Sequence, residues 1–196
     1  DLISDASSFA KAATFVIDGS STYGFVATAL GTYLYNQRIQ TEMGKDVMAW
    51  LKKQLTSSVY ATAAYSGGKS AQISSLALDG TSPKYLYAGT ATGLYRAKVS
   101  SLATATKAPP LDSLVSGVKV QKLAAAIFGD ISYAAYVDGE GLVTILKNGV
   151  ASVTFPFYSY TATPSGIRSL VFFEASGALD LAITSADGLV IAEVAK

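Results

Sequence analysis

The feature that most constrains this chain is a hairpin pattern that recurs about every 47 residues. In each copy an apolar, strand-like run leads into a short polar turn that ends in glycine, and a second apolar run follows. The turn glycines are Gly31, Gly93, Gly141 and Gly188. The last three of them lie 48 and 47 residues apart. Because self-similarity at a fixed period marks a repeat architecture, the sequence predicts about four repeated β units.

A second set of landmarks gives the same period. Each hairpin follows another strand-like run, and these runs begin at Ala12, Ile73, Val120 and Ile167. The last two intervals are both 47 residues, whereas the first is 61. The longer first interval contains the stretch 39–55, in which apolar residues recur at every fourth position, a spacing typical of one helix face. We therefore predict one helix, inserted into the first repeat near residues 39–55.

Repeats of this length, with three or four short strands and glycine turns, are typical of a β-propeller. The sequence therefore predicts an all-β, β-propeller-like fold built from about four repeats of antiparallel strands. We expect one propeller-like domain over residues 1–196, and its repeats are 10–71 with the helical insertion, 72–118, 119–165 and 166–196. Two arrangements stay open. The repeats form a small four-bladed ring closed by residues 1–9, or they form part of a larger ring or a longer protein.

One repeat carries a resemblance to a known family. Residues 73–99 contain LALDG and YLYAGTATGLYRAKV, and they resemble the blades of sialidase- and sortilin-like propellers, which are called BNR-type repeats. The other three repeats are degenerate, and the Asp-box that often follows in these families is missing. The resemblance therefore implies the propeller fold and lends almost no support to sialidase chemistry.

Composition excludes several kinds of chemistry. The chain has no Cys and no His, which excludes disulfides, Cys/His zinc sites and nucleophiles paired with histidine. The net charge is +1 and the basic residues are scattered, whereas nucleic-acid binding requires a basic stripe. No apolar run approaches the roughly 20 residues of a membrane-spanning helix. We therefore predict no cofactor, no metal site, no nucleic-acid partner and no membrane span.

Any catalysis would have to use carboxylates or tyrosine. Four acids at or near equivalent strand ends are weak candidates for a paired-acid site, namely Asp18, Asp79, Asp130 and Glu174. Turn formation is the favoured interpretation of these acids, because Asp beside Gly is typical of turns. Aromatic residues are enriched at interfaces, and the candidate binding residues are Trp50 in the predicted helix, Tyr158 and Tyr160. Core packing is the competing interpretation of the tyrosines.

The absence of a convergent catalytic motif favours a non-catalytic binding or assembly module over an enzyme. The expected partner is a protein or a glycan, and a homo-oligomer is an open option. The alternatives are a glycan-acting hydrolase of the sialidase-like propeller type that uses carboxylates and Tyr, or a fragment of a larger multidomain protein. A composition rich in Ser, Thr, Ala and Tyr with only two Asn residues favours an extracellular, periplasmic or cell-surface location.

Overall fold

The computed structural model describes residues 10–18, 21–28, 32–36, 73–80, 84–98, 112–157, 166–186 and 188–196. All regular elements in these ranges are β-strands, which confirms the predicted all-β fold. The predicted helix near 39–55 lies outside the described residues, and so do three candidate binding residues, Trp50, Tyr158 and Tyr160.

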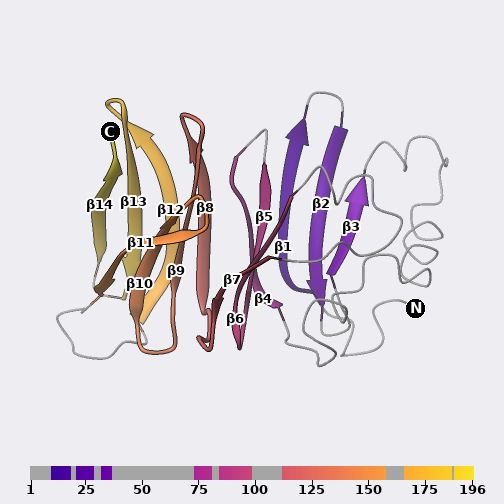
Figure 1. The fold of residues 1–196 in the computed structure, drawn as a ribbon, viewed down its shortest axis with the longest axis horizontal. Coiled ribbons are helices and arrows are strands. Elements are labelled where there is room, and N and C mark those ends of the chain that lie inside the picture. Colours follow the sequence, from indigo (N-terminus) through magenta and orange to yellow (C-terminus); the bar gives the residue numbers. More distant parts are fainter. Residues whose placement is uncertain are drawn as a thin grey trace.

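The strands form four separate sheets, and each sheet is continuous in sequence (Figure 1). The first sheet contains β1 (Ala10–Asp18), β2 (Ser21–Thr28) and β3 (Thr32–Asn36). The second contains β4 (Ile73–Leu78), β5 (Tyr85–Thr90), β6 (Gly93–Lys98) and β7 (Asp112–Ser116). The third contains β8 (Lys122–Phe128), β9 (Ile131–Val137), β10 (Leu142–Lys147) and β11 (Val150–Pro156). The fourth contains β12 (Ile167–Ala175), β13 (Ala178–Ser185) and β14 (Leu189–Ala195).

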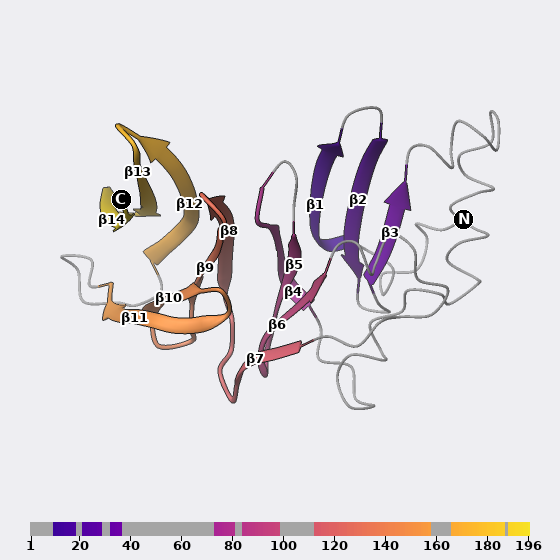
Figure 2. The same ribbon diagram turned by 45° about the horizontal axis from the view of Figure 1, so that its top comes forward.

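Strands that follow one another within a sheet pair antiparallel, as expected for segments joined by short turns. The first strands of the sheets pack against one another in chain order, β1 on β4, β4 on β8 and β8 on β12. From these strands the sheets spread outward like the blades of a propeller (Figure 2).

The first and fourth sheets lie at opposite ends of the row (Figures 1 and 2). Packing between neighbouring sheets is carried by their first strands, and this series begins with β1 and ends with β12. The described sheets therefore form an open fan.

The hairpin in YLYAGTATGLYRAKV joins β5 to β6, as the sequence predicts. The Thr90 hydroxyl organises its turn, because it accepts hydrogen bonds from the backbone N–H of Thr92 (3.1 Å) and of Gly93 (3.0 Å). The sequence pattern predicts Gly93 as a turn glycine, but the structure gives another reason for glycine at this position. Its φ is not positive, but a Cβ atom there would lie 2.2 Å from the carbonyl oxygen of Val115 in the adjacent strand β7. Glycine at this position is required by close strand approach and not by turn conformation.

The turn between β10 and β11 consists of Asn148 and Gly149. Both residues have positive φ, 51° and 88°, which is the conformation of a type I′ hairpin turn. Asn tolerates this conformation better than most residues that have a Cβ, and Gly149 has no Cβ to oppose it. The dipeptide therefore sets the register in which β11 returns along β10.

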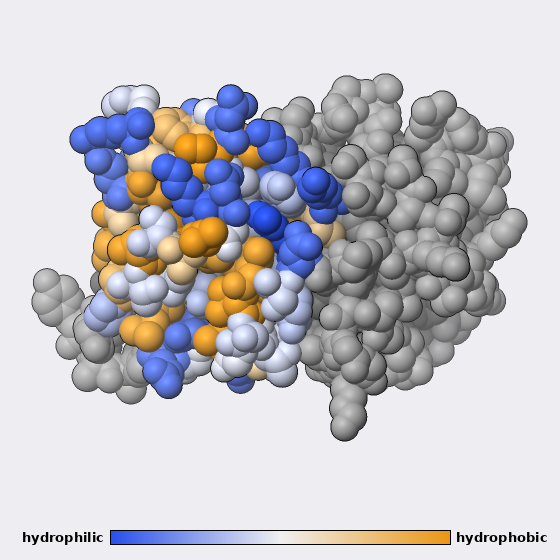
Figure 3. Space-filling model, in the orientation of Figure 1, coloured by the Kyte–Doolittle hydropathy of each residue, from blue (hydrophilic) through white to orange (hydrophobic). Residues whose placement is uncertain are grey.

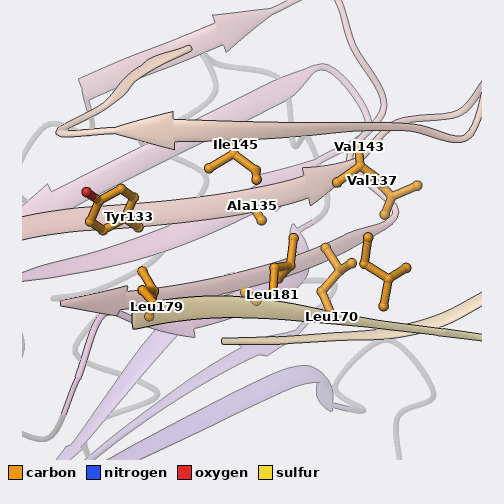
Figure 4. Close-up of a cluster of buried hydrophobic side chains, with 10 residues drawn as sticks. Tyr133, Ala135, Val137, Val143, Ile145, Leu170, Leu179 and Leu181 are labelled. Atoms are coloured by element: carbon orange, nitrogen blue, oxygen red, sulfur yellow. The ribbon is translucent and has the colours of Figure 1, made fainter. Parts of the chain in front are cut away.

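Two apolar cores join the second, third and fourth sheets. The core between the third and fourth sheets is built from side chains of β8, β9, β10, β12 and β13 that point toward one another (Figure 4). The core between the second and third sheets includes Tyr87, Leu94, Tyr136 and Leu146. In β9 the side chains alternate between these cores, so Tyr133 and Ala135 face the fourth sheet and Ala134 and Tyr136 face the second. The third sheet is therefore apolar on both faces, as stacking requires.

Candidate binding site

Asp79, one of the four candidate acids, is fully buried between the second and third sheets. Its Oδ1 accepts hydrogen bonds from the backbone N–H of Lys84 (2.9 Å) and of Tyr85 (3.1 Å). Its Oδ2 accepts a hydrogen bond of 2.6 Å from the hydroxyl of Ser132, which lies on β9. Because all of these partners belong to the protein and the side chain is enclosed, the carboxylate has a structural role, and a substrate cannot reach it.

The hydrogen bonds continue from Ser132 to Tyr87. The two hydroxyl oxygens are 2.6 Å apart, and the proton of Ser132 is already given to Asp79, so the Tyr87 hydroxyl is the donor. Tyr87 lies on β5 and Ser132 on β9, and the chain of three side chains therefore links two sheets. Buried polar groups connected in this way hold neighbouring elements in a defined register.

A second set of contacts supports the same junction. Asn148 Oδ1 accepts a hydrogen bond from the Ser132 backbone N–H (3.1 Å), and the Ser132 carbonyl accepts one from the Asn148 N–H (2.7 Å). Arg96 of the second sheet donates through Nη1 to the Asn148 carbonyl (3.1 Å) and lies 4.4 Å above the centre of the Tyr85 ring. The Arg96 hydrogen bond thus crosses to the third sheet, and the cation–π contact with Tyr85 holds the guanidinium in place within the second sheet.

The Tyr87 phenol should make stability depend on alkaline pH. Burial raises the pKa of Tyr87 above its usual value of 10.0, and the negative charge of Asp79 raises it further. The folded state therefore favours the neutral phenol, so this contribution to stability is complete below pH 10.0 and is lost as the pH rises through the folded-state pKa. We expect urea unfolding in steps above pH 10 to show a smaller fall in unfolding free energy for Tyr87→Phe than for the wild type. Equal slopes in the two proteins would contradict this role.

The other candidate acids lie in different surroundings. Asp130 lies in the turn between β8 and β9 and is exposed, with Lys84 Nζ 3.8 Å from its Oδ1 and 3.1 Å from its carbonyl oxygen. Glu174 is an exposed residue of β12. Asp18 is the last residue of β1, and its side chain lies outside the described part of the structure. The structure therefore encloses Asp79 and leaves Asp130 and Glu174 at the surface.

A cavity of about 490 Å³ lies between the third and fourth sheets. Asp130 is part of its wall, whereas Asp79 and Glu174 are not. Its apolar lining residues are Phe128, Ile131, Tyr133, Ile145, Val153, Val194 and Ala195. Its polar and charged lining residues are Asp130, Lys147, Ser152, Glu193 and Lys196. Glu193 and Lys196 form an exposed ion pair of 3.1 Å. The cavity is thus lined by apolar residues together with side chains of both signs of charge.

Two exposed valines lie on the outer strands of the two sheets, and one of them, Val153, lines the cavity. Val153 of β11 pairs in register with the core residue Ile145, and Val190 of β14 pairs with the core residue Ile183. Paired residues share a face of their sheet, so both valines lie on the faces that the two sheets turn toward each other. Each is nevertheless 47% exposed. We call the cavity together with Val153 and Val190 the outer groove.

The space-filling view shows apolar and hydrophilic residues side by side over the described sheets (Figure 3). The sequence did not reveal the outer groove, because the apolar residues of β11 and β14 look like ordinary core positions. Their exposure depends on where each sheet ends, and the repeat pattern does not report this. Among the described residues, no group of acidic side chains could hold a metal ion, and no helix is long and apolar enough to span a membrane.

Comparison with known proteins identifies no sequence family. No protein-family model matches the chain, and no curated protein matches it. Among solved structures, the chain is similar to BBS1N in complex with ARL6DN soaked with mercury, with a TM-score of 0.42 and 13% identity. It is also similar to the same complex soaked with lead, with a TM-score of 0.46 and 11% identity.

These matches cover 94% and 93% of this chain but only 62% and 53% of the BBS1N chains. The chain thus spans about half to three fifths of the length of the solved structures that it matches. At this level of similarity the comparison carries no conclusion about function. The propeller-like description of the fold rests on the pairing and stacking of the strands.

Proposed function

We propose that this protein is a non-catalytic binding module that engages a protein partner at the outer groove. The observation that carries the proposal is the exposure of Val153, which lines a cavity with many apolar residues, and of Val190, which lies on the face that the fourth sheet turns toward the third. Exposed apolar residues gathered around a hollow and rimmed by charge are typical of interaction sites.

The shape and chemistry of the outer groove suit a protein segment. A volume of about 490 Å³ accommodates a large aliphatic or aromatic side chain, the kind of anchor that dominates protein interfaces. At the rim, Asp130 and Lys147 offer an acceptor and a donor to the backbone of the incoming segment. The chain's net charge of +1 provides no strong field that would select a highly charged partner.

Three further parts of the proposal rest on the sequence alone, namely a glycan as partner, export, and kinship with BNR-type propellers. A glycan is the alternative occupant of the same groove, since tyrosine and carboxylate side chains also contact sugars. Export to the cell surface or beyond is supported by the composition. Kinship with BNR-type propellers is supported by residues 73–99. The hydrolase alternative loses its candidate acids, because Asp130 lines the cavity whereas Asp79 and Glu174 do not, and the other lining acid, Glu193, forms an ion pair with Lys196.

The test is to present arrays of peptides and arrays of glycans to the purified protein, and to compare the wild type with Val153→Lys. We expect peptides with an aromatic or aliphatic anchor to bind, and Val153→Lys to weaken them roughly tenfold or more. Val171→Lys is the matched control, because Val171 is similarly exposed but lies on β12, away from the outer groove. Binding to glycans alone would replace the protein partner by a glycan, and binding that is indifferent to Val153→Lys would refute the site.

A further inference from the structure

The outer edge of the fourth sheet is a row of backbone groups that no described strand covers. In the second and third sheets a fourth strand covers the third, because β7 pairs with β6 and β11 pairs with β10. The fourth sheet has the order β12-β13-β14, so among the described strands β14 has a partner on one side only (Figure 1). The Ser185 N–H donates to the Gly188 carbonyl oxygen (2.9 Å). Because hydrogen-bonded and non-hydrogen-bonded pairs alternate along β13 and β14, the N–H groups of Leu189, Ile191 and Glu193 point away from β13.

The strand β14 is much more exposed than β10, which holds the same position in the third sheet. In β10 the residues from Val143 to Leu146 are all buried. In β14 three consecutive residues, Leu189, Val190 and Ile191, are 59%, 47% and 56% exposed. Because consecutive side chains lie on opposite faces, β14 exposes apolar residues on both of its faces. An edge strand in this state is a template on which another strand can pair.

The outer edge of β14 adjoins the outer groove. Val194 and Ala195 of β14 line the cavity, and Val153 of β11 stands in the same wall. Val190 pairs with the core residue Ile183 and therefore shares the face that the fourth sheet turns toward the third. A strand laid along this edge would place every second side chain on the same face, beside Val190 and toward the groove. Apolar side chains suit these positions.

Acidic side chains mark one position along this edge. Asp180 of β13 pairs in register with Glu193 of β14, and like charges directly opposite each other are unfavourable. Among the described residues one cation stands here, because Lys196 Nζ lies 3.1 Å from Glu193 Oε1. Two carboxylates thus share one lysine. A Lys or Arg opposite Glu193 on an added strand would supply the missing positive charge.

We propose that the partner of the outer groove adds an extended segment of its own chain to the outer edge of β14, as a fourth, antiparallel strand. The segment carries Lys or Arg opposite Glu193 and apolar residues opposite Ala192 and Val190. In the sequence of an antiparallel segment these apolar residues follow the basic residue by one and by three positions. Segments that bind by strand addition gain affinity from main-chain hydrogen bonds and specificity from alternate side chains. That the segment belongs to a protein partner rests on the proposed function, whereas the exposed edge does not.

Hydrogen exchange on the full chain tests the edge itself. The strand β11 covers β10 in the third sheet, and a copy of it with Ser152→Lys has the proposed pattern, because Val and Phe follow the new Lys by one and by three positions. This copy is fused after Lys196 through a flexible Gly/Ser linker, which holds it at a high effective concentration. We expect the exchange of the outward N–H groups of β14 to slow at least roughly tenfold.

The matched control is the same fusion with Ala151→Pro and Thr154→Pro in the copy. These two positions are three apart, so one of the prolines removes an N–H that faces β14 in either register. The control should exchange like the unfused chain. Unchanged exchange in the first fusion would overturn the proposal. Outward N–H groups that are already as slow in the unfused chain as those of Val190 and Ala192 would overturn it too, because the chain itself would then fill the edge.

Free peptides then test the basic residue and separate this proposal from the outer groove. Two synthetic peptides copy β11, one with Ser152→Lys and one with Ser152→Glu, and both are titrated into the full chain. The Lys peptide should bind roughly fivefold more tightly, and Glu193→Gln in the full chain should remove the difference. Equal binding to the wild type would refute the basic residue. Binding that is weakened by Val153→Lys but leaves exchange in β14 unchanged would keep the groove and refute strand addition. Slower exchange in β14 with binding indifferent to Val153→Lys would keep strand addition and refute the groove.

Discussion

Replacing Asp79 by alanine is expected to lower the free energy of unfolding by about 4 kcal/mol. The substitution leaves the backbone N–H groups of Lys84 and Tyr85 without their acceptor and removes the acceptor of the Ser132 hydroxyl. Each buried donor left unpaired costs about 1–3 kcal/mol. Urea unfolding followed by circular dichroism measures the loss.

Three further variants make this prediction specific. Asp79→Asn should lose less stability, because its amide oxygen still accepts from the two backbone groups while its NH₂ faces Ser132. Asp130→Ala is the matched control, since its carboxylate is exposed, and it should unfold like the wild type. In a double-mutant cycle, Asp79→Ala and Ser132→Ala should be non-additive, because they remove the same hydrogen bond. An Asp79→Ala protein with stability within about 1 kcal/mol of the wild type would contradict the structural role.

The Asp79 network shows where prediction from sequence stops. Its local part, in which an Asp beside Gly bonds to nearby backbone N–H groups, follows from general turn chemistry. Its other partner, Ser132, is 53 residues away in the next sheet. The 47-residue period predicts that the two repeats lie side by side, but it does not say which side chain of one repeat meets which of the other. That detail depends on how two twisted sheets pack.

The arrangement of the sheets is likewise only partly predictable from the sequence. The repeat pattern predicts antiparallel hairpins in sequence order, and the structure confirms them in β5–β6, β9–β10 and β13–β14. Whether repeats close a ring depends on the rotation from each sheet to the next. This rotation is set by packing between sheets, and local residue preferences do not encode it. The sequence therefore left a four-bladed ring and part of a larger ring or a longer protein as alternatives, and in the structure the described sheets lie in a row with the first and fourth at its ends.

Replacing Gly93 by alanine is the second large expected effect, a loss of about 3 kcal/mol in the free energy of unfolding. The new Cβ would lie 2.2 Å from the Val115 carbonyl oxygen, and real Cβ contacts are essentially never shorter than 3.0 Å. The obstacle is backbone, so β6 and β7 must separate at the position where Gly93 pairs with Ser116. Thermal unfolding and hydrogen exchange at the β6–β7 pairing measure the effect.

Gly139→Ala separates this packing effect from the general effect of replacing glycine. Gly139 has no positive φ, and the nearest atom to a Cβ at this position is the Lys119 Cβ at 3.8 Å. We expect Gly139→Ala to keep wild-type stability or to gain a few tenths of a kcal/mol, because alanine restricts the unfolded chain. If Gly93 served only the conformation of its turn, Gly93→Ala would leave the β6–β7 exchange rates unchanged. Faster exchange in β6 and β7, with β9 and β10 unaffected, is the result that close strand approach requires.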